Sequence, residues 1–442
     1  MARHLKPKSN EVLTLQVVDL SHEGQGIARH NGRAVFIDGV LPGETVTVQL
    51  LRHRKGVQEA VLNDVIVPSP DRVEPKCEHY KFCGGCVQQH LDSEKQLQFK
   101  QNQLLENMVR IGKVEVPTIL PPLQARIWNY RRRARLGARF VIQKNRTLVG
   151  FRERSNSKLA DIKQCVVLHE PLDKLIEPLS ELLTQLSVRD RVPQVECAVA
   201  DNVTALVVRI LDDLTPADLE LLHQFQQDHQ VQLYLQREGY ETVKPLTPET
   251  AKPLSYKLPD FNLEYEFLPN DFIQVNGELN QLMIRRAIDL LEVNKTDRVA
   301  DLFCGLGNFS LPLAQHAQAV LGVEGEINLV TRAKTNAIRN GLANVEFMVG
   351  NLFEDQQGAP WTRGKFNKVL LDPPRAGARE ILPMLPRMGA ERIVYISCHP
   401  GTLARDAGIL VNELGYTLLS AGVLDMFPHT AHVESMAVFE RK

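Results

Sequence analysis

A thiol and a carboxylate in this chain stand where they could share a catalytic site. Cys398 follows the apolar, β-branched run 392–396, which is typical of a buried strand in a parallel sheet, and Glu434 follows in the segment 432–436. Ligands of open α/β sheets bind at the carboxyl ends of the strands. There a thiol can act as a nucleophile and a carboxylate as a general base. An unpaired cysteine is more often a small buried hydrophobe, so neighbouring segments must decide between the two interpretations.

A glycine-rich turn upstream predicts a nucleoside-binding site. Residues 299–309 have the pattern of an apolar strand, a turn with two glycines and the start of a helix with free amide donors. The third glycine of the dinucleotide fingerprint is absent and Phe309 would crowd a pyrophosphate, so a nucleoside without phosphates fits better. The next strand, 319–324, ends in Glu324, which is placed to accept hydrogen bonds from both ribose hydroxyls. This order of elements indicates S-adenosylmethionine.

Two further predicted strands end in polar residues. Residues 344–350 lead into Asn351, placed to read an adenine edge, and 368–371 lead into Asp372, with Arg375 close behind. Asn and Asp more commonly cap helices or form turns at such positions. The repetition of polar residues at successive strand ends favours a functional role.

Several motifs resemble those of the RNA uracil-C5-methyltransferases, most closely the bacterial enzymes that methylate a uridine of 23S ribosomal RNA. The shared motifs lie across nearly the whole chain, at residues 271–276, 301–305, 371–377, 397–398, 425–430 and 432–436. One position departs from the pattern, because the family usually has Asn after Ser-Cys and this chain has His399. The departure leaves the local hydrogen bonding open and does not affect the nucleophile.

The resemblance implies a mechanism and a set of ligands. The Cys398 thiolate would add to C6 of uracil, C5 would attack the methyl group, and Glu434 would remove the C5 proton. A free thiol has a pKa of about 8.5, so the site must activate Cys398, through Arg375 or His399. Asp372 is expected either to bind the cofactor or to hydrogen-bond the uracil N3 edge. The expected cofactor-binding residues are Gln274, Phe303, Asn308, Glu324, Asn351 and Asp372.

Four cysteines of the amino-terminal half indicate a metal centre. They are Cys77, Cys83, Cys86 and Cys165. Four thiolates suit tetrahedral zinc or a [4Fe–4S] cluster, and the spacing does not distinguish them; His79 is an alternative zinc ligand. The family resemblance implies the [4Fe–4S] cluster with these four ligands. Seven cysteines in 442 residues, with no secretory signal, favour a reducing cytoplasm over a disulfide framework, and Cys197 and Cys304 are expected in the core.

The net charge of −1 conceals a basic segment. Between Arg126 and Lys158, 11 Lys or Arg residues stand against a single acid. Residues 129–140 have strand composition, so alternate arginines would share one face, opposite Arg132. Those arginines are Arg131, Arg133, Arg135 and Arg139. A basic stripe is often only a solvated surface, but beside a nucleobase-modifying site it favours contact with RNA phosphates, first of all by Arg131, Arg133 and Arg135.

The length predicts about three domains. Residues 1–10 are expected to form a disordered basic tail, and 11–68 a small OB-like β-barrel that resembles the TRAM domain. Residues 69–262 would form a mixed α+β iron–sulfur and RNA-binding domain, whose helix 93–111 could pack on either neighbour. Residues 263–442 would form a Rossmann-like, S-adenosylmethionine-dependent methyltransferase domain. The fold class is therefore multidomain α/β.

The sequence thus predicts a cytoplasmic enzyme that makes 5-methyluridine in 23S ribosomal RNA, with no membrane segment and no obligate protein partner. A transfer RNA uracil-C5-methyltransferase would use the same site, but that type lacks the barrel and the cluster cysteines in the family pattern. A non-catalytic RNA-binding iron–sulfur protein is the alternative from another class. It would have no need to combine Cys398, Glu434 and the glycine-rich turn.

Overall fold

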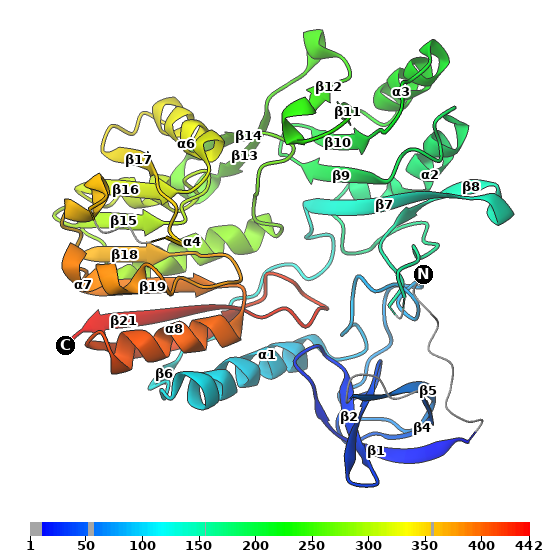
Figure 1. The fold of residues 1–442 in the computed structure, drawn as a ribbon, viewed down its shortest axis with the longest axis horizontal. Coiled ribbons are helices and arrows are strands. Elements are labelled where there is room, and N and C mark those ends of the chain that lie inside the picture. Colours follow the sequence, from blue (N-terminus) through cyan, green and yellow to red (C-terminus); the bar gives the residue numbers. More distant parts are fainter. Residues whose placement is uncertain (1–10, 52–56, 155, 355–357) are drawn as a thin grey trace.

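The computed structural model describes residues 11–51, 57–154, 156–354 and 358–442, and the predicted basic tail 1–10 lies outside these ranges. A β-barrel, a central α+β domain and a large α/β domain are arranged around a shared middle region (Figure 1). No helix in the described ranges is long and apolar enough to cross a membrane.

The barrel is closed and five-stranded, in the order β1-β2-β3-β5-β4. Its strands are β1 (Leu13–Leu20), β2 (Gly26–His30), β3 (Arg33–Ile37), β4 (Thr45–Leu50) and β5 (Gln58–Val67). Inward-facing apolar residues such as Val17, Val35 and Val46 alternate with more exposed ones, and they form a core separate from the rest of the molecule. The predicted OB-like barrel is confirmed.

The central domain is built on a six-stranded sheet with the order β12-β11-β10-β9-β7-β8. Its strands are β7 (Arg133–Val141), β8 (Arg146–Gly150), β9 (Gln194–Val199), β10 (Thr204–Arg209), β11 (Val231–Gln236) and β12 (Lys244–Pro245). Helices α2 (Ile176–Gln185) and α3 (Pro216–Asp228) pack against it. The loop 77–91, which carries three of the four cysteines, is joined to this domain by a bridge between Cys83 and Glu153.

The carboxyl-terminal domain has an eight-stranded sheet in the order β17-β16-β15-β18-β19-β21-β20-β6. Its strands are β15 (Arg298–Leu302), β16 (Ala319–Glu324), β17 (Val345–Val349), β18 (Lys368–Leu371), β19 (Arg392–Ser397), β20 (Tyr416–Leu424), β21 (Glu434–Arg441) and β6 (Thr118–Ile119). The strands from β17 to β19 are parallel, and β21 is antiparallel to both of its neighbours. The order reverses between β15 and β18, which is where ligands of such sheets bind. The predicted Rossmann-like architecture is confirmed.

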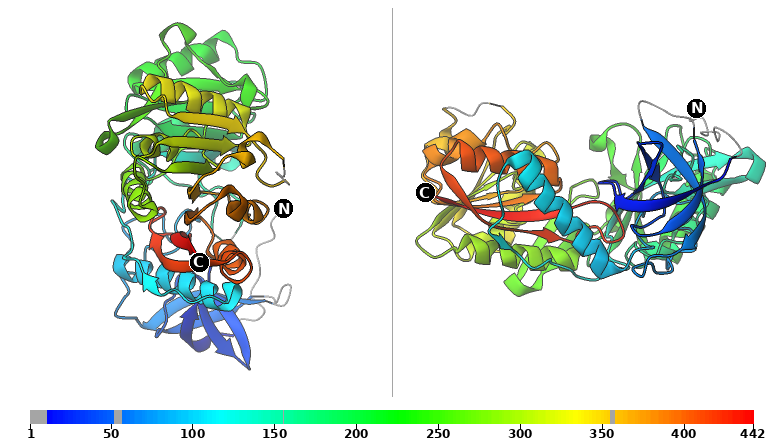
Figure 2. Two further views of the ribbon diagram at one scale, coloured as in Figure 1. Left: turned by 90° about the vertical axis from the view of Figure 1, so that its left-hand side faces the viewer. Right: turned by 90° about the horizontal axis from the view of Figure 1, so that it is seen from below.

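Helices lie along both faces of this sheet (Figure 1). They are α4 (Gly277–Leu291), α5 (Ser310–Ala314), α6 (Ile327–Arg339), α7 (Leu385–Met388) and α8 (Pro400–Asn412). The predicted helix 93–111 is α1 (Ser93–Asn107), continued by a π-helical turn to Gly112, and it packs on α8 and β20. Figure 2 shows α1 running from the carboxyl-terminal domain toward the barrel. The chain from 93 to 119 is therefore part of the carboxyl-terminal domain, although it precedes the central sheet in sequence.

The expected boundary at residue 262 falls inside a hairpin. Strand β13 (Leu254–Leu258) pairs with β14 (Leu263–Phe267), and Tyr256 stacks on Tyr265 with ring centroids 4.8 Å apart. The Tyr265 hydroxyl donates a hydrogen bond to the Gly307 carbonyl at 3.2 Å, in the glycine-rich turn. Because this hairpin supports the turn, the carboxyl-terminal unit begins near residue 254.

Candidate active site and cysteine cavity

Strand pairing brings Cys398 and Glu434 together. In the antiparallel pair β19–β21, Ser397 lies opposite Ser435. The next facing positions are Cys398, just beyond the end of β19, and Glu434, the first residue of β21. Side chains at facing positions project to the same side of a sheet, with Cβ atoms about 5 Å apart. The sheet thus places the thiol beside the carboxylate, at the edge where β15 to β18 also end.

The surroundings of Cys398 favour its neutral form. Burial, followed by the charges of Glu434 and Asp372, raises the pKa of the thiol to about 11, although Arg375 acts to lower it. Burial also raises the pKa of Glu434 to about 7, against the opposing effects of Arg375 and Lys100. Burial and the charge of Glu434 raise the pKa of Asp372 well above its usual value. Arg375 therefore favours the thiolate, as expected, without offsetting the burial.

His399 does not supply the activating charge. Burial, followed by the charge of Arg375, lowers the pKa of His399, so the ring is neutral at neutral pH. Its Nδ1 accepts a hydrogen bond from the Thr402 amide at 3.2 Å, which caps the first turn of α8. A side chain that accepts from an early amide is what Asn provides at a helix start. His399 thus fills the capping role at the position where the family usually has Asn.

The backbone conformation of the glycine-rich turn leaves room for a ligand. Phe303 and Gly305 follow β15 with φ values of 67° and 55°, in the left-handed region that a Phe rarely adopts. The Gly305 amide donates to Glu324 Oε2 at 3.2 Å, and the Gly325 amide donates to Oε1 at 2.7 Å. A Cβ added at Gly305 would meet no atom within 4 Å. The turn therefore faces open space, with Glu324 at its border.

The remaining expected cofactor residues differ in their surroundings. Asn351 is exposed after β17, and its Nδ2 donates to Glu354 Oε1 at 2.6 Å. Asn308 exchanges two hydrogen bonds of 2.9 Å with Asn280, and its Oδ1 also accepts from the Tyr256 hydroxyl at 3.2 Å. The amide of Asn308 is thus engaged in holding the turn to α4 and to the hairpin. Partly exposed Gln274 precedes α4.

Two buried charges at this edge were not singled out from the sequence. Asp301, the fourth residue of β15, accepts a hydrogen bond from the Ser310 hydroxyl, and burial raises the pKa of its carboxyl to about 7. Lys100, on α1, donates to Asp425 Oδ1 at 2.7 Å. The buried face of α1 also carries Gln96 and Gln101, so no apolar pattern in the sequence marks Lys100 as buried. Its partner is 325 residues away, which a single sequence does not reveal.

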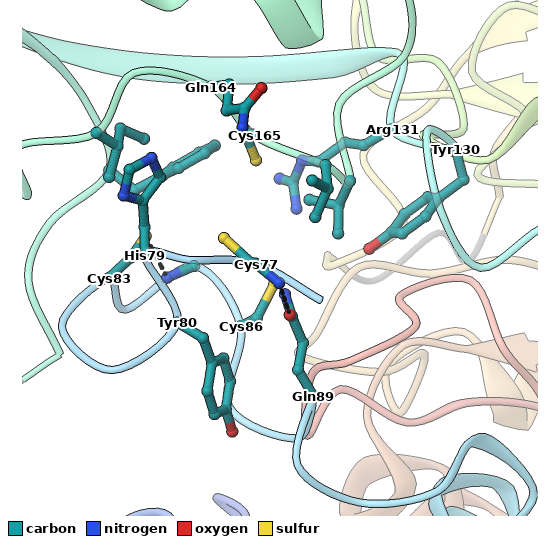
Figure 3. Close-up of a pocket in the computed structure, with 15 residues that line it drawn as sticks. Cys77, His79, Tyr80, Cys83, Cys86, Gln89, Tyr130, Arg131, Gln164 and Cys165 are labelled. Carbon is teal, nitrogen blue, oxygen red and sulfur yellow. Dashed lines mark hydrogen bonds between the residues drawn. The ribbon is translucent and has the colours of Figure 1, made fainter. Parts of the chain in front are cut away.

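The four predicted cluster cysteines line one cavity of about 200 Å³. Figure 3 shows Cys77, Cys86 and Cys165 directed toward the same space, with Arg131 beside them. Burial raises the pKa of all four thiols, to about 11 for Cys86 and about 12 for Cys165. In the described part of the chain, no three His, Cys, Asp or Glu side chains lie at the spacing of a metal site. The thiols therefore share a cavity without converging on one point.

The other cysteines and His79 have structural surroundings. Cys197 and Cys304 are buried in the core, as predicted, with exposed fractions of 1% and 4%. His79 Nε2 accepts a hydrogen bond from the Lys163 amide at 3.2 Å, which ties the loop 77–91 to the chain beside Cys165.

The predicted arginine stripe is only partly correct. Strand β7 begins at Arg133, so Arg131 lies before the strand, and its guanidinium lines the cysteine cavity instead of sharing the face. Arg133 and Arg135 both pair with Glu196, at 3.8 Å and 2.9 Å. The Arg133 side chain is largely buried, whereas Arg135 is 59% exposed and Arg139 is also exposed. The exposed cationic surface of β7 is therefore at Arg135, which is also paired with Glu196, and at Arg139.

A doubly wound sheet whose switch-point edge carries a glycine-rich turn and an acid at the next strand end is typical of enzymes that bind a nucleoside-containing ligand. Cys398 and Glu434 stand at the same edge. Comparison with known proteins specifies the family. Residues 92–442 match the family described as tRNA (Uracil-5-)-methyltransferase, and residues 7–62 match the TRAM domain. The chain therefore belongs to the RNA uracil-C5-methyltransferase family and carries an amino-terminal TRAM domain.

Similar proteins extend over the full length. A 23S rRNA (uracil(1939)-C(5))-methyltransferase RlmD of Methylococcus capsulatus is 49% identical, with 99% of this chain and 98% of that protein covered. The protein of the same name from Legionella pneumophila strain Lens is 48% identical, with 99% and 100% covered. Among solved structures, the Pyrococcus abyssi tRNA (uracil-54, C5)-methyltransferase in complex with S-adenosyl-L-homocysteine aligns with a TM-score of 0.74 over 97% of this chain and 100% of that one. At 24% identity, this likeness supports the fold.

Proposed function

We propose that this protein methylates C5 of a uridine in 23S ribosomal RNA, with S-adenosylmethionine as the methyl donor. The pairing of Cys398 with Glu434 across β19 and β21, beside the glycine-rich turn, is the observation that carries the chemistry. The choice of 23S RNA rests on the near-full-length relatives that are 47–49% identical to this chain. Such a substrate would place the enzyme in the cytoplasm.

Cys398 supplies the nucleophile that uracil needs. The Cys398 thiolate adds to C6 and forms a carbon–sulfur bond, and the electron pair of the C5–C6 double bond moves to the ring as an enolate. S-adenosylmethionine supplies an electrophilic methyl group on a sulfonium, which leaves as a neutral thioether when C5 takes the methyl. Without the thiol addition, C5 is too weak a nucleophile for this transfer.

Glu434 completes the reaction as the base. The methylated adduct carries one proton on C5, and the Glu434 carboxylate removes it. The electron pair of that C–H bond restores the C5–C6 double bond, and the Cys398 thiolate leaves. A base with a pKa near 7 is well matched to this step at neutral pH. Both faces of the ring must be reached, so the uridine has to leave its stack.

The open edge of the sheet fits the nucleoside part of the methyl donor. We assign Glu324 to the ribose hydroxyls and Asn351 to the adenine edge, with Phe303, Gln274 and Asp372 around them. The open space in front of Gly305 supports this assignment. Asn308 acts indirectly in this proposal, because its amide holds the turn to Asn280 and Tyr256. Because the charge of Asp372 acts on the Cys398 thiol, we also consider Asp372 a candidate to contact the uracil.

The cysteine cavity fits a [4Fe–4S] cluster in its donor set. Four buried or half-buried thiols with raised pKa values would stay protonated on their own, and a cationic cluster would stabilise them as thiolates. Cys77, Cys83, Cys86 and Cys165 would hold it, linking the loop 77–91 to the chain before α2. A cluster bound by all four cysteines would have no open iron, so its contribution would be structural. Zinc is the alternative, because it accepts the same donors.

RNA contact is proposed for the exposed arginines of β7, for Arg131 beside the cysteine cavity and for the TRAM barrel. Arg133 is assigned only a supporting role, because Glu196 and the Pro269 carbonyl occupy its guanidinium. A transfer RNA substrate is the second candidate, since the family description and the solved structure name tRNA enzymes. A non-catalytic RNA-binding protein is disfavoured by the intact thiol–carboxylate pair.

Covalent trapping tests the chemistry. Cys398→Ala is expected to bind RNA and abolish turnover, whereas Glu434→Gln is expected to methylate C5 and then remain attached to the RNA. Denaturing gels with 23S RNA fragments and radiolabelled methyl donor distinguish the two. If Glu434→Gln turns over at the wild-type rate, another group is the base.

A further inference from the structure

The segment 425–432 leads directly into Glu434 and lies between three parts of the molecule. It connects β20 to β21 and projects from the sheet toward the central domain and the barrel (Figure 1). Helix α1, the loop 77–91 and residues 128–130 all contact it through hydrogen bonds or ring stacking. The position of the first residue of β21 therefore depends on how this segment is held.

Lys100 anchors the start of the segment through a buried ion pair. Its Nζ donates to Asp425 Oδ1 at 2.7 Å and to the Phe427 carbonyl at 3.0 Å. The Lys100 and Asp425 side chains are only 1% and 2% exposed. Burying two charges costs free energy that an apolar pair would not cost. Such a pair, joined to a backbone carbonyl, fixes one conformation of the segment.

His429 anchors the middle of the segment. It has a φ of 66°, and its ring stacks on Trp128 with centroids 3.8 Å apart. The His429 amide donates to Gln96 Oε1 at 2.9 Å, one helical turn before Lys100 on α1. The His429 carbonyl accepts from the Val87 and Gln88 amides at 2.9 and 3.0 Å. Lys100 is thus part of a continuous set of contacts that also includes the backbone just after Cys86.

We propose that Lys100 is a positioning residue for the base Glu434, acting through the segment 425–432. The inference rests on the proposed function, in which Glu434 removes the C5 proton. The Lys100 side chain makes the only ion pair of the segment among the residues described, and it sets where β21 starts relative to Cys398. Its loss would displace the base from the methylated adduct without removing any group that binds RNA or the methyl donor.

The charge of Lys100 also supports the base, because it lowers the pKa of Glu434. The charged and titratable groups that face Glu434 are Arg375 and Asp372 beyond β18, Cys398 beyond β19, and Lys100 on α1. Arg375 and Lys100 both lower the pKa of Glu434, against the effect of burial. Without Lys100 the pKa of Glu434 is expected to rise, so less of the base is available at neutral pH. A pH profile therefore separates this role from a purely structural one.

The test compares Lys100→Met with Lys95→Met in the full-length protein. Lys95 lies one turn earlier on α1 in an exposed pair with Asp71, so it is a matched control. With 23S RNA fragments and S-adenosylmethionine, Lys100→Met is expected to bind RNA normally and to form the covalent adduct. It is expected to resolve the adduct roughly 10- to 100-fold more slowly than the wild type. That factor is part of the rate enhancement that a correctly placed general base provides. The acid limb of the resolution rate is expected to shift to higher pH. Lys95→Met is expected to match the wild type.

A second variant distinguishes a loss of positioning from simple misfolding. Lys100→Met combined with Asp425→Leu replaces the buried pair by apolar side chains, which commonly preserves stability. It is expected to fold and still resolve the adduct slowly. Wild-type resolution and an unmoved acid limb in either folded variant would overturn the positioning role. If Glu434→Gln itself forms no adduct, the proposed chemistry fails instead, whatever Lys100 does.

Discussion

At the scale of single residues, the ionisations of Cys398 and Glu434 oppose each other. A charged Glu434 raises the pKa of the thiol, so the thiolate forms more readily when the carboxyl is neutral. In the proposed mechanism, proton removal from C5 requires the charged carboxylate of Glu434. With a pKa of about 7, Glu434 can exist in both states at neutral pH. The two groups therefore titrate as a pair, and changing one should alter the other.

Thiol reactivity measures this coupling directly. Glu434→Gln removes the negative charge and is expected to speed alkylation of Cys398 at pH 8 by roughly threefold or more, because each pKa unit is tenfold in thiolate population. Iodoacetamide labelling with peptide mapping reports Cys398 separately from the other thiols. Glu440→Gln, at the far end of β21 and paired with Arg392, is the control. Equal rates in the two variants would show that the charge of Glu434 does not reach the thiol.

The pKa of Glu434 also leads to a prediction for the pH dependence of adduct resolution. Burial raises the pKa of Glu434 to about 7, and only its charged form accepts the C5 proton. The rate of resolution is therefore expected to rise with pH through about 7 and then level off. Quenching preformed adduct at pH values from 5.5 to 8.5, with times measured on denaturing gels, gives the profile. A rate that falls across this range would assign the step to an acid.

At the scale of elements, the sequence predicted local features and missed distant ones. The strands at 319–324 and 368–371 agree with prediction because short apolar or β-branched runs between turns carry their own signal. The strand expected from 129 begins at Arg133 instead. Asn129 has a φ of 50°, and the Arg131 and Arg132 amides donate to Val167 and Val275, far away in sequence. Such contacts, like the Lys100–Asp425 pair, have no local signature.

If the exposed arginines of β7 contact RNA phosphates, the salt dependence of RNA binding should change when they are removed. Arg135→Ala and Arg139→Ala are each expected to weaken RNA binding and to reduce the slope of log affinity against log salt by roughly 0.7 per lost phosphate contact on single-stranded RNA. Arg133→Ala should instead lower stability, because it removes a largely buried side chain that donates to the Pro269 carbonyl, while Glu196 keeps Arg135 as a partner. Filter binding at several salt concentrations, with thermal unfolding alongside, separates these effects. Unchanged salt slopes would show that these arginines do not contact RNA phosphates.

The proposed [4Fe–4S] cluster in the cysteine cavity leads to a prediction about metal content. Protein purified without oxygen is expected to be brown, with about four iron atoms per chain and little zinc. Cys165→Ser is expected to lose iron, unfold at lower temperature and bind RNA less well, while S-adenosylmethionine binding stays unchanged. Cys197→Ser, a buried thiol away from the cavity, tests whether lost packing alone gives that result. Colourless wild-type protein with one zinc per chain would replace the iron–sulfur assignment.

At the scale of the whole molecule, three distant parts meet beside the catalytic pair. A Cβ added at Gly24, in the barrel, would lie 3.4 Å from Val87 in the cysteine loop and 3.5 Å from Ala431 in the segment that leads to Glu434. The buried Glu44 of the barrel also accepts hydrogen bonds from Arg72. The TRAM barrel therefore contacts the segment that leads to Glu434, so RNA bound to the barrel would lie on the same side of the molecule as that segment.

This arrangement predicts which RNA is modified. Both 23S and transfer RNA enzymes need the same thiol, base and methyl donor, so discrimination must come from the barrel, the loop 77–91 and the face of β7. Several separated contacts suit a long looped stretch of unassembled 23S RNA better than a compact transfer RNA. We expect methylation of naked 23S fragments and little activity on unmodified transfer RNA, measured by radiolabelled methyl transfer.

Deletion of residues 1–67 tests the contribution of the barrel. The barrel has its own core, so the remaining chain keeps the buried residues of the catalytic sheet. The deletion is expected to raise KM for 23S fragments more than it lowers kcat, because the thiol–carboxylate pair lies outside the barrel. Arg72→Ala, which removes the partner of Glu44 while leaving the barrel in place, indicates how much depends on docking alone. Efficient methylation of transfer RNA with 23S fragments inert would reject the ribosomal substrate and leave the shared chemistry.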